Sequence, residues 1–154
     1  MTKSLNDWAQ RSVWLAWALL LAIAIGAAAL MLDRRPPFTI TSYEVNSPRA
    51  GGILMVNANV ARELERRCSV TFSRYMVDSS GLRADLMPDF TMTAQALEEL
   101  DHATPGRLRL DIHIPDYVSA GPAVLVTPLE YRCNPWHSLM PIETTMVIKF
   151  EVAP

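Results

Sequence analysis

The sequence predicts an all-β protein in which an N-terminal transmembrane helix precedes an antiparallel β-sandwich of six or seven strands. Three patterns carry this prediction. Residues 13–32 form an apolar run of 20 residues without a charge. The rest of the chain alternates apolar and polar residues with a period of two, as half-buried strands do. Clusters of proline, glycine, asparagine and serine separate the alternating runs, which is typical of strands joined by tight turns.

The apolar run reads VWLAWALLLAIAIGAAALML, about the length that crosses the hydrocarbon core of a bilayer. Tryptophans near its start match an interfacial aromatic belt, and charged residues followed by Pro36-Pro37 end the helix. The residues expected at the two membrane interfaces are Trp14, Trp17, Arg34 and Arg35. We expect a retained anchor. A cleaved signal peptide is the alternative, because Lys3 and Arg11 form a basic segment and Ala27-Ala28-Ala29 offers small residues for cleavage.

Charge alone leaves the orientation of this helix open, because two basic residues precede the apolar run and two follow it. We predict the C-terminal domain on the outer side, since its two cysteines suit an oxidising compartment. The expected parts of the chain are a cytoplasmic N-terminus at 1–12, a transmembrane helix at 13–32, a linker at 33–37 and an extracytoplasmic domain at 38–154. The prediction is thus a single-pass protein of the bacterial inner membrane, with its C-terminal domain in the periplasm or outside the cell.

The clearest alternation lies at residues 107–114, where leucine and isoleucine share one face and Arg, Asp and His share the other. The same pattern recurs near the C-terminus, at 144–152. Further strands are expected at 38–45, 53–60, 67–77 and 123–133, with a weak one near 90–92. One short helix is expected at 94–100, with Thr93 as its N-cap and Leu97 and Leu100 facing inward.

The chain contains two cysteines, Cys68 and Cys133. Neither belongs to a C-x-x-C pair, which excludes a four-cysteine zinc site. An even count beside an export segment favours a disulfide, and the parity of each cysteine on its strand points it into the core. We therefore predict a bond that links the two sheets and contributes about 4 kcal/mol through chain entropy. Two unpaired buried cysteines are the alternative.

Tyr131-Arg132-Cys133 places a tyrosine two residues before the second cysteine. In this respect the chain resembles immunoglobulin-like domains, whose tyrosine corner has the same spacing. The resemblance implies an Ig-like sandwich with a disulfide between its sheets. The chain departs from that family because no tryptophan follows Cys68 in the next strand, and Trp136 comes after the second cysteine instead.

Residues 133–140 read CNPWHSLM and resemble the copper loop of cupredoxins, which are also β-sandwiches. The resemblance implies a copper or electron-transfer site, in which a thiolate and an imidazole bind strongly and a thioether weakly. Its ligands would be Cys133, His137 and Met140. Cupredoxins also use a second histidine from an upstream strand, and the chain offers only His102 and His113.

The same loop has two other interpretations. In one, Trp136, Leu139 and Met140 cap the end of the sandwich, an ordinary role for apolar residues in a loop bounded by prolines. In the other, the loop is exposed and contacts a partner protein. The candidate contact residues are then Trp136, His137, Leu139 and Met140.

Composition and motifs exclude several classes of function. The net charge is −2, and residues 33–154 carry 12 basic and 15 acidic groups, which is not typical of a nucleic-acid binder. The chain has no glycine-rich phosphate loop, no H-E-x-x-H sequence and no carboxylate pairing suited to acid–base chemistry. We therefore expect no catalytic residues and no enzyme activity.

Function is expected in binding rather than catalysis. The first hypothesis is a non-enzymatic interaction or assembly module with bilayer and protein partners and no cofactor. The alternatives are the copper-binding domain and an accessory subunit of a larger membrane complex, for which Gly26-Ala27-Ala28-Ala29 offers a small-residue helix face. Twelve arginines against two lysines indicate a GC-rich bacterial or bacteriophage genome, so an envelope protein of either origin fits.

Overall fold

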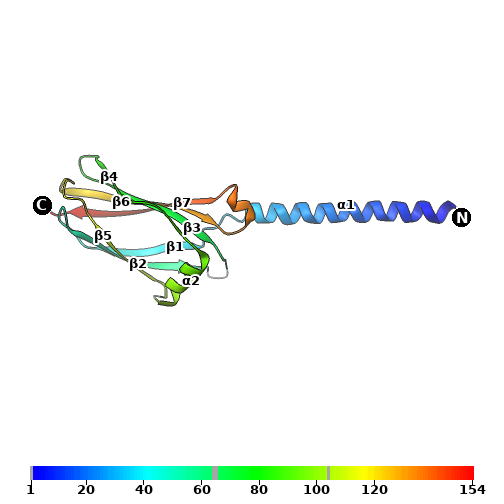
Figure 1. Ribbon diagram of the computed structural model, residues 1–154, viewed down its shortest axis with the longest axis horizontal. Coiled ribbons are helices and arrows are strands. Elements are labelled where there is room, and N and C mark those ends of the chain that lie inside the picture. Colours follow the sequence, from blue (N-terminus) through cyan, green and yellow to red (C-terminus); the bar gives the residue numbers. More distant parts are fainter. Residues whose placement is uncertain (1, 64–65, 104) are drawn as a thin grey trace. The chain divides into compact units, whose positions relative to one another are not determined.

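The computed structural model describes residues 2–63, 66–103 and 105–154, without the side chains of residues 2–9, 97 and 100–103. It divides into two compact units, Met1–Arg34 and Arg35–Pro154. The first unit contains a long helix, and the second contains all the strands of the described chain (Figure 1).

Helix α1 runs from Thr2 to Leu32. Within it, Gln10–Leu32 is long and apolar enough to span a membrane, in agreement with the apolar run in the sequence. Trp14 and Trp17 have exposed side chains on this helix. The helix ends shortly before Pro36-Pro37, because proline lacks the N–H that a helix needs and disfavours a helical residue before it. The segment predicted as a cytoplasmic N-terminus is helical from Thr2 onward, and its cellular side stays a prediction.

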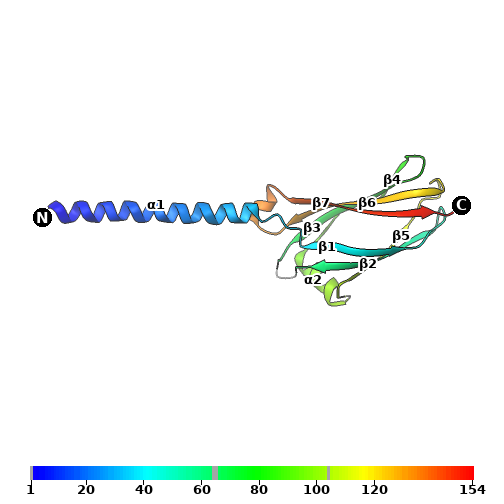
Figure 2. The ribbon, with the colours of Figure 1, turned by 180° about the vertical axis from the view of Figure 1, so that it is seen from behind.

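Within the described residues, seven strands form two antiparallel sheets, which confirms the predicted sandwich with an N-terminal helix. One sheet has the order β1 (Phe38–Val45), β2 (Ile53–Arg62), β5 (Arg107–His113). The other has the order β4 (Arg83–Met92), β3 (Ser69–Val77), β6 (Gly121–Arg132), β7 (Ile142–Val152). Figure 2 shows the two sheets from behind, lying face to face along the length of the sandwich.

Strand β4 is much longer than the weak strand expected near 90–92. Its sequence contains Pro88, which breaks the alternation, and its pairing with β3 shifts register around Arg74. A proline is tolerated there because β4 lies at the edge of its sheet, where an unpaired backbone position costs little.

The predicted short helix is present as α2 (Ala94–Ala103), between β4 and β5. The Ala96 amide donates to the Thr93 hydroxyl over 3.3 Å, which confirms Thr93 as the N-cap. The expected inward positions of Leu97 and Leu100 lie outside the described side chains.

The main core lies between the sheets and is built from the inward positions of the alternating strands. Leu54, Met76, Leu125 and Ile148 are fully buried in it. A second cluster packs Val70, Tyr131 and Ile142 together, with Phe38 and Cys133 against them. The second cluster gathers the first residue of β1 with the start of β3, the end of β6 and the start of β7. We call this end of the sandwich the proximal end, because the chain enters the domain there, and the opposite end the distal end.

Candidate functional site

Cys68 and Cys133 form a disulfide, as predicted. Cys68 directly precedes β3 and Cys133 directly follows β6, and these strands are neighbours, with Ser69 opposite Arg132. The bond therefore joins two adjacent strands of one sheet at the proximal end, and the prediction that it links the two sheets is wrong. The alternation of inward and outward residues did not reveal that the two cysteines belong to the same sheet. Both cysteines lie just beyond the ends of their strands.

The resemblance to immunoglobulin-like domains extends to a two-sheet sandwich and no further. Its disulfide lies within one sheet rather than between sheets. Tyr131 is buried, but its hydroxyl has no hydrogen-bond partner among the described residues. A tyrosine corner needs that hydroxyl to bond to the backbone upstream, so the spacing of Tyr131 and Cys133 does not produce the corner.

The loop after β6 contains a short 3-10 helix, η1 (Pro135–Ser138), which the sequence did not predict. The Asn134 side-chain oxygen caps it by accepting from the His137 amide over 3.1 Å. His137 is buried, and its Nδ1 accepts from the Cys133 amide over 3.3 Å. The imidazole therefore holds the loop closed and is withdrawn from any surface contact.

This geometry does not assemble the copper ligands that the cupredoxin resemblance implied. The sulfur of Cys133 is bonded to Cys68 and offers no thiolate, and Nδ1 of His137 is engaged with the backbone. Met140 lies on the surface. Elsewhere, across the described residues, no three His, Cys, Asp or Glu side chains gather in a way that could hold a metal ion.

The apolar residues after η1 do not cap the sandwich as expected in one interpretation. Leu139 is 77% exposed and Met140 is 62% exposed, whereas Trp136 is half-buried. The loop lies at the proximal end, between Cys133 and Ile142, which both belong to the second cluster. Of the four residues predicted as a partner contact, Leu139 and Met140 are exposed, Trp136 is half-buried and His137 is buried.

A cavity of about 200 Å³ lies between the sheets at the proximal end. Strands of both sheets and helix α2 contribute to its walls. The walls are mainly apolar and include Phe38, Phe72, Met92, Leu110, Leu129 and Met146. Exposed lining residues, Glu63, Arg67 and Glu98, mark its opening to solvent.

The polar side chains that line this cavity without being exposed are Arg62, Arg66, Arg74, Thr127 and Tyr131. The half-buried Arg74 donates from Nε to the buried Thr127 hydroxyl over 3.4 Å, and its guanidinium lies 5.7 Å from the ring centroid of Phe72. Burial lowers the pKa of Arg74 from its usual value, and burial raises the pKa of Tyr131 to about 12. The Tyr131 hydroxyl therefore keeps its proton at neutral pH, and the guanidinium of Arg74 has only donors to offer.

Arg74 has no carboxylate partner in the part of the chain that the structure describes. Its charge faces a mainly apolar cavity, and among the described residues it interacts with the Thr127 hydroxyl and the Phe72 ring. The sequence analysis did not identify this site, although the alternation of residues along β3 indicated it. Arg74 shares its inward parity with the buried Val70 and Met76, which is an unusual place for an arginine.

A scan against models of known protein families gives no match for this chain, and neither does a search of curated proteins.

Proposed function

We propose that this protein is a non-enzymatic, membrane-anchored interaction module of a bacterial or bacteriophage-encoded envelope, with its sandwich in the periplasm or outside the cell. The observation that carries the proposal is the Cys68–Cys133 disulfide in the domain that directly follows an apolar helix. Disulfides persist in oxidising compartments and are rare in the cytoplasm, so this pairing favours a sandwich outside the cytoplasm.

The contact surface of the module is the tip formed by Leu139 and Met140, and its partner is the lipid surface. Six residue steps separate Leu32 from Phe38, a span of at most about 20 Å of extended chain. Phe38 packs in the same cluster as Cys133 and Ile142, which flank the tip. A linker of this length allows the tip to reach the bilayer, where exposed Leu and Met side chains gain free energy by entering the interface.

Topology is tested with single added cysteines in the full chain. Tyr117 is 65% exposed, in the loop between β5 and β6 at the distal end, and Ser4 lies in the predicted cytoplasmic segment. We expect a membrane-impermeant maleimide to label Tyr117→Cys in intact cells and Ser4→Cys only after the cells are broken. The reverse pattern would place the sandwich in the cytoplasm and refute the proposal.

Lipid contact is tested by spin labelling Met140→Cys in proteoliposomes that contain only this protein. We expect the nitroxide at position 140 to be more accessible to oxygen than to a polar nickel complex, because oxygen concentrates in the bilayer. A label on Tyr117→Cys at the distal end is the matched control and should show the aqueous pattern. An aqueous pattern at both positions would rule out lipid as the partner of the tip and leave a protein partner.

A further inference from the structure

We infer that the cavity between the two sheets binds a medium-chain aliphatic carboxylate, with its head group on Arg74 and its chain along the apolar walls toward the proximal opening. This ligand site is independent of the tip at Leu139 and Met140. The inference rests on three features: the charge of Arg74, which no described carboxylate pairs, the size and polarity of the cavity, and the position of Arg74 within it.

The half-buried positive charge of Arg74 favours the binding of an anion. Its guanidinium is half-buried beside Phe72, and one nitrogen donates to Thr127. Bringing an ion out of water is costly unless it is paired. A guanidinium presents parallel N–H donors that match the two oxygens of a carboxylate, and no described carboxylate of the chain takes this place.

The rest of the cavity suits an aliphatic chain. Its volume of about 200 Å³ exceeds the roughly 150 Å³ of an engineered cavity that takes up benzene. A chain of about six to eight carbons fits a space of that order, and a longer one would extend through the opening. Water would fill the same space poorly, because each buried water needs two to four polar partners and the walls are mainly apolar.

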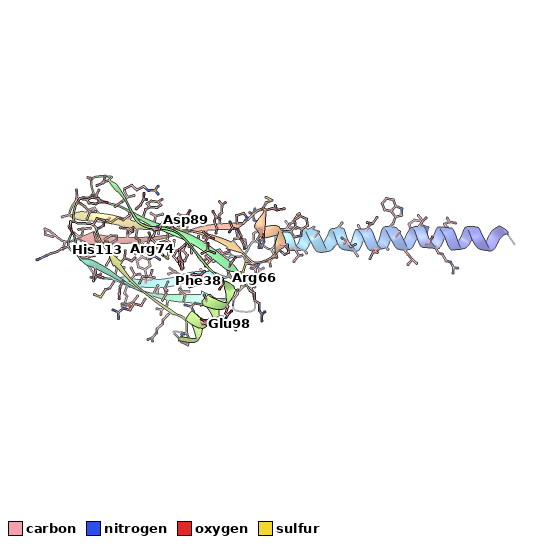
Figure 3. The ribbon with its side chains drawn as sticks, viewed as in Figure 1. Phe38, Arg66, Arg74, Asp89, Glu98 and His113 are labelled. Atoms are coloured by element: carbon pink, nitrogen blue, oxygen red, sulfur yellow. A yellow bond between two sulfur atoms is a disulfide. The ribbon has the colours of Figure 1, made fainter. Side chains whose placement is uncertain are left out.

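The position of the charge favours a free carboxylate over a membrane phospholipid. Figure 3 shows Arg74 between the sheets, farther along the sandwich than Phe38 and Arg66, which lie toward the proximal end. The anionic head must therefore enter first and the chain must follow. A carboxylate is small enough for this path, whereas a phospholipid head group carrying two acyl chains is too large for a cavity of this volume.

Tyr131 supplies a second sign of a built site. Its side chain lines the same cavity, and its buried hydroxyl has no hydrogen-bond partner among the described residues. Buried polar groups in native proteins are nearly always hydrogen-bonded, and an exception needs an explanation, such as strain, a catalytic role or a bound water or ion.

The test compares octanoate with octanamide, its neutral isostere, on the full chain in phosphatidylcholine nanodiscs. Equilibrium dialysis measures both affinities, and empty nanodiscs give the background from partition into lipid. We expect octanoate to bind at least tenfold more tightly than octanamide, since a hydrogen-bonded ion pair contributes on the order of tenfold to a hundredfold in affinity. Arg74→Met should abolish this preference, so that octanoate binds no more tightly than octanamide.

Arg109→Met is the matched control, because Arg109 is exposed on β5, pairs with Asp111 and does not line the cavity. It should keep the preference for octanoate. Urea unfolding then separates binding from folding. Arg74→Met removes a half-buried charge that no described carboxylate pairs, so its unfolding midpoint should not fall below that of the unmodified protein. Absence of octanoate binding, equal affinities for both probes, or an unchanged preference in Arg74→Met would each overturn the inference.

Discussion

Asp78 and Ser119 join two distal loops that lie 41 residues apart: the Asp78 Oδ2 accepts a hydrogen bond from the Ser119 amide over 2.8 Å. The other carboxylate oxygen accepts from the Ser80 hydroxyl over 2.6 Å, and from the amides of Ser80 and Leu82 over 2.9 Å each. The Ser80 hydroxyl, followed by the Ser119 amide and the other amides, holds the pKa of Asp78 well below its usual range. One carboxylate thereby fixes the β3–β4 turn and attaches it to the loop between β5 and β6.

This geometry makes the stability of the sandwich sensitive to acid. The pKa of Asp78 is lower in the folded protein than in the unfolded chain, so its contribution is complete above the unfolded value of about 3.9 and is lost as the pH falls toward the folded value. We expect Asp78→Asn to lower the urea midpoint at pH 7 and to flatten its decrease below about pH 4. Asp85→Asn is the control, because Asp85 is largely exposed. A variant with the same pH dependence as the unmodified protein would contradict the role given to Asp78.

The disulfide closes a loop of 65 residues. In the chain-entropy model, a loop of that length contributes about 4 kcal/mol to the free energy of unfolding. We expect the full chain in nanodiscs to unfold at a much lower urea concentration when reductant is present. Because the cysteines lie next to the paired residues Ser69 and Arg132, reduction also frees the proximal ends of β3 and β6.

The double variant Cys68→Ala/Cys133→Ala provides the control for this measurement. It should match the reduced protein and show no response to reductant. Equal urea midpoints for the oxidised and reduced protein would mean that the bond adds nothing to stability.

Alternation predicted most strands well because each has one face against the core. Burial along β2 alternates residue by residue from Ile53 to Ala61, as the sequence pattern indicated. Parity reports which face a residue occupies and not which strand lies beside it. The pairing of Cys68 with Cys133 was therefore predictable, but their location on neighbouring strands of one sheet was not.

The candidate site was less predictable than the fold. The composition of the loop predicted the exposed tip at Leu139 and Met140. It did not predict the burial of His137, which depends on the cap at Asn134 and on the turn of η1. The cavity depends on how two sheets and α2 come together at one end. The one sequence feature that indicated the cavity is Arg74, an arginine at an inward position of β3 where the strand pattern calls for an apolar residue.

Tyr131→Phe distinguishes the observed role of this tyrosine from a tyrosine corner. In a corner, loss of the hydroxyl removes a hydrogen bond and lowers the free energy of unfolding by about 1 kcal/mol. Here the buried hydroxyl has no partner among the described residues. Burying it without a hydrogen bond destabilises the folded state, and removing it relieves that destabilisation. We expect Tyr131→Phe to raise the free energy of unfolding by about 1 kcal/mol, measured by urea unfolding without added ligand.

Tyr43→Phe is the matched control for that substitution. The Tyr43 hydroxyl accepts from the Lys149 amide over 3.4 Å and connects β1 to β7. Its loss should lower the free energy of unfolding by about 0.5 kcal/mol, at the weak end for a neutral hydrogen bond. Both substitutions remove a tyrosine hydroxyl. Changes of opposite sign in the free energy of unfolding are therefore expected only if the Tyr131 hydroxyl has no hydrogen-bond partner. If Tyr131→Phe lowered the free energy of unfolding more than Tyr43→Phe does, the Tyr131 hydroxyl would have a hydrogen-bond partner, as in a tyrosine corner. It would then no longer count as an unsatisfied polar group of the cavity.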